Sequence, residues 1–99
     1  MTGNKSITIL GATGSVGGST LSLVREHPDR FVVHALTANS DYERLAKLAL
    51  EFKPAHVVIA DEAFYSPLSE TLAGTGIEVC AGASALIEIA AQKVDLVVG

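Results

Sequence analysis

The chain has 99 residues, of which 48% are hydrophobic and 18% are charged, so it can form one small domain with its own core. Lys and Arg number 7 against 11 Asp and Glu, and the formal net charge of -4 argues against a nucleic-acid-binding surface. The single cysteine, Cys80, cannot form an internal disulfide and favours a reducing compartment. Because no apolar run reaches membrane-spanning length and no signal peptide is recognisable, we expect a cytoplasmic protein that does not bind membranes.

The first half of the chain predicts two strands joined by a helix. Residues 6–10 form an apolar run that is typical of a buried strand and ends at Gly11. An amphipathic helix over residues 16–26 should follow and end before Pro28, because the residue that precedes a proline is disfavoured in helical geometry. Residues 31–38 are apolar and β-branched, which predicts the second strand.

The second half repeats this alternation. Ser40 followed by Glu43 is a capping-box pattern and predicts a second helix, which Pro54 ends. The remaining expected elements are strands over residues 57–60, 77–80 and 96–98, and helices over residues 66–73 and 84–92.

Strands that alternate with helices predict an α/β fold, a Rossmann-like doubly wound parallel sheet with helices on both faces. Right-handed crossovers leave few topologies, and we expect the strand order 3-2-1-4-5. The sequence stops at Gly99, directly after an apolar strand, so we expect a single domain that is truncated at its C-terminal end.

The most informative segment is the glycine loop, residues 10–17, which links the first strand to the first helix and reads Leu-Gly-Ala-Thr-Gly-Ser-Val-Gly. Glycines in this place are typical of dinucleotide-binding loops, although their spacing here is Gly-x-x-Gly-x-x-Gly. Gly11 should allow the tight turn, Gly14 should let a backbone at positive φ approach a pyrophosphate, and Gly17 should let the helix pack closely. The helix N-terminus offers free N–H groups to a phosphate. Two residues of the loop can add hydroxyl donors: Thr13 and Ser15.

The end of the second strand bears on the choice of cofactor. An NAD site usually has Asp or Glu about 20 residues beyond the glycines, where it holds the ribose 2′-hydroxyl. Residues 37–40 read Thr-Ala-Asn-Ser and have no carboxylate, so NADP is preferred over NAD. Arg44 is the nearest candidate cation for a 2′-phosphate. Asp41 is interpreted as a charge at a helix N-terminus, with ribose binding as the alternative.

The other polar residues suggest neither a catalytic group nor a metal site. Asp61 and Glu62 are adjacent, cannot face one point from a strand, and are interpreted as a solvated turn. Cys80 is expected to be a small buried residue. The three histidines lack the spacing of metal ligands: His27, His34 and His56.

The ordered set of motifs resembles the 1-deoxy-D-xylulose 5-phosphate reductoisomerase family over essentially the whole chain. Beyond the glycine loop, the resemblance rests on Thr20-Leu21, Arg25, residues 28–31 (Pro-Asp-Arg-Phe), 35–38 (Ala-Leu-Thr-Ala), 52–54 (Phe-Lys-Pro), 57–59 (Val-Val-Ile), 79–82 and Leu86.

This resemblance implies an NADPH-dependent, metal-requiring (Mg or Mn) enzyme of non-mevalonate isoprenoid biosynthesis. It would rearrange and reduce the small-molecule substrate 1-deoxy-D-xylulose 5-phosphate to 2-C-methyl-D-erythritol 4-phosphate, as a homodimer. The family's metal and substrate residues lie beyond residue 99, so residues 1–99 are expected to be the NADP-binding domain alone, without catalytic or metal-binding residues and inactive by itself. The implied cofactor contacts are Thr13, Gly14, Ser15, Val16, Asn39, Ser40 and Asp41. Family members often carry a basic residue where this chain has Ser40, so the preference for NADPH over NADH should be modest.

Two other enzyme classes share a Gly-Ala-Thr-Gly-x-Val-Gly loop and remain alternatives: extended short-chain dehydrogenases or epimerases, and semialdehyde dehydrogenases. A free-standing nucleotide-binding sensor module is the non-enzyme alternative. The residues that would follow Gly99 distinguish them, through a Tyr-x-x-x-Lys motif, a nucleophilic cysteine or a metal-binding Asp-x-Glu motif.

Overall fold

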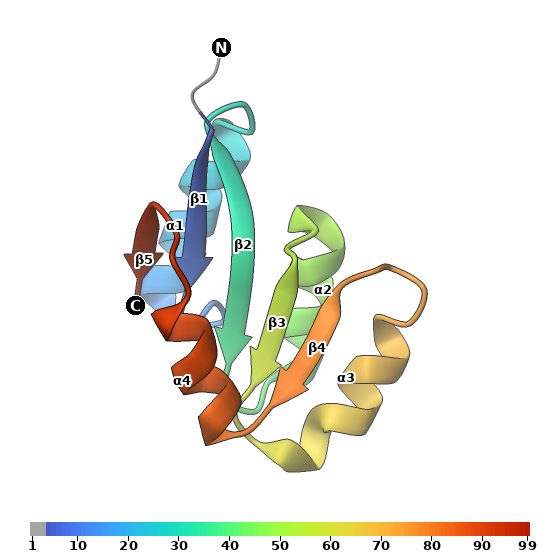
Figure 1. Ribbon diagram of the computed structural model, residues 1–99. Coiled ribbons are helices and arrows are strands. Elements are labelled where there is room, and N and C mark those ends of the chain that lie inside the picture. Colours follow the sequence, from blue (N-terminus) through green and yellow to red (C-terminus); the bar gives the residue numbers. More distant parts are fainter. Residues whose placement is uncertain (1–3) are drawn as a thin grey trace.

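The computed structural model describes residues 4–99, which form one five-stranded parallel sheet with helices on both of its faces (Figure 1). The α/β fold class is therefore confirmed, and every expected helix and strand is present within one or two residues of its expected ends. In chain order the elements are β1 (Lys5–Ile9), α1 (Ser15–Glu26), β2 (Phe31–Ala38), α2 (Tyr42–Phe52), β3 (His56–Ile59), the 3-10 turn η1 (Glu62–Phe64), α3 (Tyr65–Thr71), β4 (Glu78–Ala81), α4 (Ala83–Ala91) and β5 (Leu96–Val98).

The strand order is β4-β3-β2-β1-β5, so the expected order 3-2-1-4-5 is wrong. Strand β4 pairs with β3 rather than with β1, and β5 takes the place beside β1. The three crossovers through α1, α2 and α3 all run in one direction, and the chain turns back only after β4. A right-handed crossover that runs the other way must place its helix on the opposite face, which is where α4 lies.

The larger core lies between the sheet and helices α1, α2 and α3. It joins Ile7 and Ile9 of β1 to Leu21 of α1 and Leu45 of α2, all at most 2% exposed. Each fully buried side chain of this size contributes about 1.5–3 kcal/mol to stability. The face beneath α4 holds a smaller cluster, made by Ala35, Val58 and Ile89.

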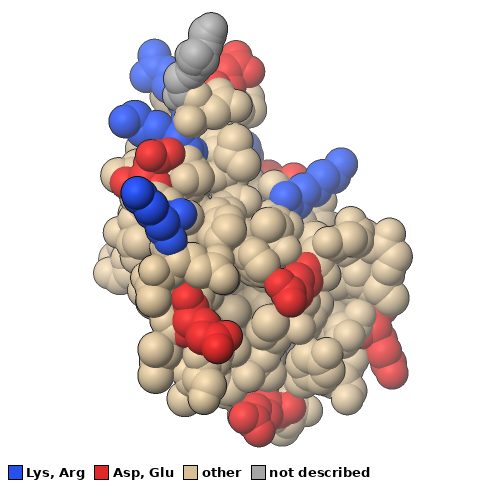
Figure 2. Space-filling model, in the orientation of Figure 1, with Lys and Arg blue, Asp and Glu red and all other residues tan. Residues whose placement is uncertain are grey.

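The surface carries both signs of charge, unevenly distributed (Figure 2). On the face drawn there, Lys and Arg lie in the upper half together with some acidic side chains. The lower part, where β2, β3 and β4 end, carries Asp and Glu but no Lys or Arg. In residues 4–99, no helix combines the length and the apolar character that crossing a membrane requires.

Helix α1 packs against the end of β1 at a distance that leaves no room for a side chain at position 17. A Cβ atom on Gly17 would lie 2.5 Å from the carbonyl oxygen of Gly11 and 2.7 Å from the Cα of Ala12. Both atoms belong to the backbone and cannot move without displacing the loop. This is the close helix packing that the third glycine of the loop predicts.

Gly17→Ala should therefore lower the free energy of unfolding by about 1–3 kcal/mol, because the added methyl group overpacks a rigid contact. Gly18→Ala is the matched control: a Cβ there meets no atom within 4 Å. That variant should be stabilised by about 0.5–1 kcal/mol, since alanine is favoured over glycine inside a helix. Urea denaturation of both variants, followed by circular dichroism, checks the pair. Equal effects of the two substitutions would contradict the packing argument.

Candidate functional site

The glycine loop leaves β1 through a single left-handed residue. Gly11 has φ +70°, a conformation that favours glycine, and its carbonyl oxygen accepts the N–H of Gly14 at 3.0 Å. Gly14 itself has φ -88° and ψ -178° and is the N-cap of α1. The expected positive φ at Gly14 is therefore wrong, because the chain already reverses at Gly11 and Gly14 only needs extended backbone to enter the helix.

Thr37 holds the loop against the end of β2. Its hydroxyl oxygen accepts the N–H of Gly11 at 3.0 Å, and its carbonyl oxygen accepts the N–H of Ala12 at 2.7 Å. Thr37 is 3% exposed, whereas Gly11 is exposed, so the hydrogen bond between them is partly buried. Sequence reasoning missed this residue, although a threonine among the apolar residues of β2 was a signal that a buried backbone group needs a partner.

The N-terminus of α1 is open to solvent. Gly14 provides no side-chain cap, and the first turn contains no acidic residue. Ser15 and Val16 are exposed, and Val16 retains 60% of its accessible surface. The first N–H groups of a helix have no acceptor within the helix, and the helix dipole adds partial positive charge there. This end of α1 is thus suited to a phosphate group.

A hollow, here called the α1 hollow, lies beside this helix end. The glycine loop contributes Thr13, Gly14 and Ser15 to its wall. The rest of the wall consists of Gly18, Ser19, Ser22 and Arg44. Gly11 and Gly17 shape the loop rather than line the hollow.

The second predicted segment lies at the end of β2. Asn39, Ser40 and Asp41 are all exposed, and the carbonyl oxygen of Asn39 accepts the N–H of Asp61 at 2.9 Å. None of the three lines the α1 hollow; the residue of α2 that does so is Arg44. The structure thus places them at the same edge of the sheet as the glycine loop without bringing them into its hollow.

Helix α2 begins one residue later than the capping box predicts. The N-cap is Asp41, whose carboxylate oxygen accepts the N–H of Arg44 at 3.2 Å. The predicted Ser40–Glu43 capping box is therefore wrong. Aspartate is as good an N-cap as serine, and here Asp41 is the residue directly before the helix. The interpretation of Asp41 as a charge at a helix N-terminus is confirmed.

Asp61 and Glu62 form the exposed turn that the sequence suggests. Asp61 caps η1, since its carboxylate accepts the N–H of Ala63 at 3.0 Å. Both residues are exposed.

Two histidines that are far apart in the sequence lie together beneath the end of α4. The ring centroids of His34 and His56 are 4.9 Å apart. His34 Nε2 lies 2.6 Å from Gln92 Oε1, and His56 Nδ1 lies 2.7 Å from Glu78 Oε1. Within residues 4–99, however, no group of three or more His, Cys, Asp or Glu side chains could hold a metal ion. The pairing satisfies polar side chains at the amino ends of β3 and β4.

Cys80 lines a small hollow together with His56 and Glu78 and is half-buried rather than buried as expected, and it is a poor nucleophile. Burial, and then the nearby charges of Glu78 and Glu88, raise the pKa of its thiol. A raised pKa keeps the thiol protonated near neutral pH, and the thiolate is the reactive form.

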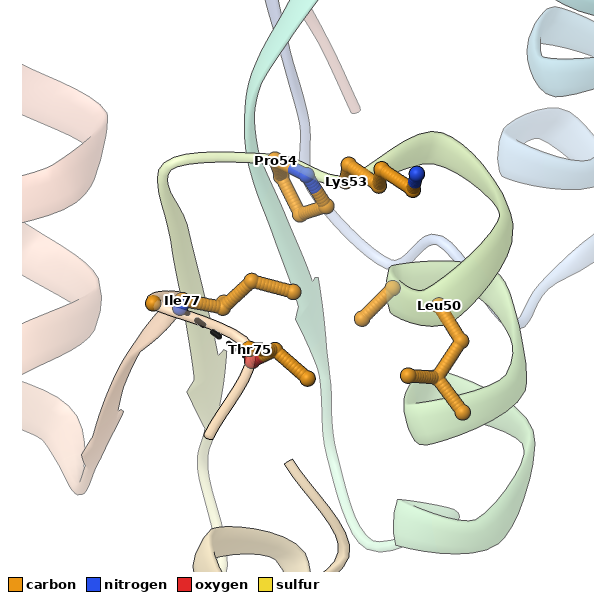
Figure 3. Close-up of a pocket in the computed structure, with 7 residues that line it drawn as sticks. Leu50, Lys53, Pro54, Thr75 and Ile77 are labelled. Atoms are coloured by element: carbon orange, nitrogen blue, oxygen red, sulfur yellow. Dashed lines mark hydrogen bonds between the residues drawn. The ribbon is translucent and has the colours of Figure 1, made fainter. Parts of the chain in front are cut away.

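A second, more apolar hollow lies between the end of α2 and the loop before β4 (Figure 3). Leu50, Pro54 and Ile77 line it, and the hydroxyl of Thr75 accepts the N–H of Ile77 at 3.2 Å. This place is near the amino ends of β3 and β4, whereas ligands of doubly wound sheets bind at the carboxyl ends. Its one ionisable residue is Lys53, so it offers no acid–base pair. The α1 hollow is therefore the better candidate.

Thr37→Val should lower the free energy of unfolding by about 1 kcal/mol, because it removes the acceptor of the partly buried Gly11 N–H group while keeping the shape of the side chain. Thr37→Ser keeps the hydroxyl and loses only a methyl group, worth about 0.8 kcal/mol. Urea denaturation of both variants checks this. A serine variant that is less stable than the valine variant would mean that packing, rather than the Gly11 hydrogen bond, is what Thr37 contributes.

Comparison with known proteins places the chain in a family. The family model described as 1-deoxy-D-xylulose 5-phosphate reductoisomerase matches residues 7–99. Among curated relatives of that name, the protein of Bradyrhizobium sp. strain BTAi1 is 56% identical over 94% of this chain, and that of Tolumonas auensis is 51% identical over 92%. The chain spans 23% and 24% of the length of these two relatives.

Solved structures agree with this match. The reductoisomerase of Zymomonas mobilis in complex with NADPH superposes with a TM-score of 0.93 at 44% identity, covering 98% of this chain and 26% of that one. A DOX-P reductoisomerase in complex with NADPH, fosmidomycin and magnesium gives a TM-score of 0.87 at 43% identity, covering 94% and 23%. The resemblance seen in the sequence is confirmed and outweighs the dehydrogenase alternatives: the chain belongs to the 1-deoxy-D-xylulose 5-phosphate reductoisomerase family.

Proposed function

We propose that this chain is the NADPH-binding domain of an enzyme that converts 1-deoxy-D-xylulose 5-phosphate to 2-C-methyl-D-erythritol 4-phosphate in the non-mevalonate route to isoprenoids. The observation that carries the proposal is the glycine loop, in which a left-handed Gly11 tied to Thr37 precedes an uncapped helix N-terminus. This is the arrangement that dinucleotide pyrophosphates require. The family match over residues 7–99 supports the choice of reaction.

The residues at the carboxyl end of β1 fit this cofactor. A Cβ at Gly14 would meet only the Gly11 carbonyl oxygen, at 3.4 Å, so the outer side of Gly14 is open for a pyrophosphate. The N–H groups of Ser15 and Val16 would hold its oxygens, with the hydroxyls of Thr13 and Ser15 beside them. Bound NADPH supplies the hydride for the reduction.

The second segment would hold the adenosine half of the cofactor. Asn39 and Ser40 are exposed at the end of β2 and can donate neutral hydrogen bonds to the ribose side. Asp41 already caps α2, which leaves its carboxylate less free to bind a ribose hydroxyl. The missing carboxylate at the tip of β2 supports NADPH over NADH.

The divalent cation does not fit the residues described here. Residues 4–99 contain no cluster that could hold a metal ion. Magnesium is present in solved structures of related DOX-P reductoisomerases. We therefore assign the cation, Mg or Mn, and the residues that hold the substrate to other parts of the intact protein, and name no catalytic or metal-binding residue in this chain.

The intact enzyme is proposed to be a cytoplasmic homodimer that acts on this small molecule and binds neither nucleic acid nor membranes.

The intact protein should oxidise NADPH in the presence of 1-deoxy-D-xylulose 5-phosphate and magnesium or manganese, and form 2-C-methyl-D-erythritol 4-phosphate. NADPH absorbance and mass spectrometry of the product check this. An intact, folded protein that binds NADPH yet leaves the substrate unchanged under these conditions would contradict the proposed reaction while leaving cofactor binding in place.

Gly14→Val should weaken NADPH binding at least about tenfold, equivalent to about 1.4 kcal/mol, because its side chain would occupy the space of the pyrophosphate. Folding should change little, since Gly14 has a negative φ and open space on its outer side. Gly14→Ala, with a smaller side chain, should give an intermediate loss. Calorimetric titration and thermal melting of the intact protein separate the two effects, and a stable valine variant with unchanged NADPH affinity would rule out the loop as the phosphate site.

A further inference from the structure

Arg44 is the one charged residue in the wall of the α1 hollow. It lies in the first turn of α2, whereas the other residues of the wall belong to the glycine loop and to α1. The backbone of Arg44 is held by the Asp41 carboxylate, and its side chain is exposed. An arginine from one helix therefore faces the phosphate-binding end of another.

The guanidinium of Arg44 is available for a ligand. The ion pairs found within residues 4–99 are Arg25–Glu51 and His56–Glu78, and neither includes Arg44. Arg25 is engaged, since it pairs with Glu51 and lies over the ring of Phe52, 5.2 Å from the centroid. Arg44 keeps its five N–H donors for an external acceptor such as a phosphate.

The carboxylates around Arg44 disfavour an anionic ligand that has no cation beside it. Asp41 and Glu43 line the adjoining hollow together with Arg44 and Lys47, and Asp61 and Glu62 lie exposed after β3. A phosphate that approaches this edge of the sheet meets several carboxylates. Ser40, at the tip of β2, offers only a neutral hydroxyl against them.

We propose that Arg44 determines the specificity of this chain for NADPH over NADH by binding the 2′-phosphate of the adenosine half. The inference rests on the proposed function. With the pyrophosphate at the N-terminus of α1, the adenosine half extends along the end of β2 toward α2, the helix that carries Arg44. The hydroxyls of Ser19 and Ser22, which line the same hollow, are neutral donors for the same phosphate.

The test is calorimetric titration of NADPH and of NADH into the intact protein and two single variants. Arg44→Ala removes the guanidinium but keeps the backbone N–H that Asp41 caps, so α2 should fold as before. The Arg44→Ala variant should bind NADPH at least about tenfold more weakly than the unmodified protein does. Its affinity for NADH should stay within about twofold of that of the unmodified protein. Lys47→Ala is the matched control, because Lys47 lines only the adjoining hollow, and it should change neither affinity by more than about twofold.

Three outcomes would overturn the inference. Arg44→Ala could leave NADPH binding unchanged, which would confine Arg44 to the surface. It could weaken the binding of both cofactors equally, which would mean that Arg44 acts on the pyrophosphate or on the folding of α2 rather than on the 2′-phosphate. Lys47→Ala could cause the same selective loss, which would indicate a general effect of surface charge. If the unmodified protein bound neither cofactor, the proposed function itself would fail, a result that these variants cannot imitate.

Discussion

The contact between Gly17 and the backbone of Gly11 and Ala12 is the constraint on which the rest of the site depends. Because position 17 has no side chain, α1 can begin directly against the turn that leaves β1. Its N-terminus is thereby fixed at the end of the strand. The two hydrogen bonds that Thr37 accepts from Gly11 and Ala12 fix the other side of the same turn to β2. The proposed phosphate site is thus made mostly of backbone, and a close packing contact holds it in place.

The three loop glycines have different structural roles, which the sequence pattern predicts only in part. Gly17 does what the pattern suggests, because close packing of helix on strand is a property of the βαβ unit itself. The left-handed residue is Gly11 rather than Gly14, since only one residue has to reverse the chain. Gly14 is left as extended backbone with open space on its outer side, so its lack of a side chain matters for a ligand more than for the fold. A pattern of glycines indicates where another group comes close to the backbone, but not whether that group belongs to the protein or to a ligand.

The sequence analysis failed where two structures were compatible with the same local sequence, or where a contact joined distant residues. Ser40 and Asp41 are both good caps, and the sequence does not decide between neighbours; the structure uses Asp41. The strand order was wrong because right-handed crossovers permit β4 to join either edge of the sheet, and no local signal specifies when the chain turns back. Thr37 was missed because its role is a tertiary hydrogen bond, made 26 residues away in sequence. Local periodicity, by contrast, predicted the helices and strands well, since β1, β2 and β3 and helices α1 and α2 bury apolar side chains.

The observed topology also explains how a phosphate could bind to a chain whose net charge is negative. Strand β1, which leads into the glycine loop, has β2 on one side and β5 on the other, and helices α1 and α4 lie on opposite faces of the sheet. The carboxyl end of β1 is therefore a split in the fold, and the uncapped start of α1 lies beside it. Attraction for phosphate would come there from the helix dipole and N–H groups, and the net charge of -4 weakens it only modestly because solvent screens exposed charges. In the proposed mode of binding, the 2′-phosphate would lie outside this split, close to exposed carboxylates. A single side-chain cation would therefore decide there, rather than at the pyrophosphate, which cofactor binds.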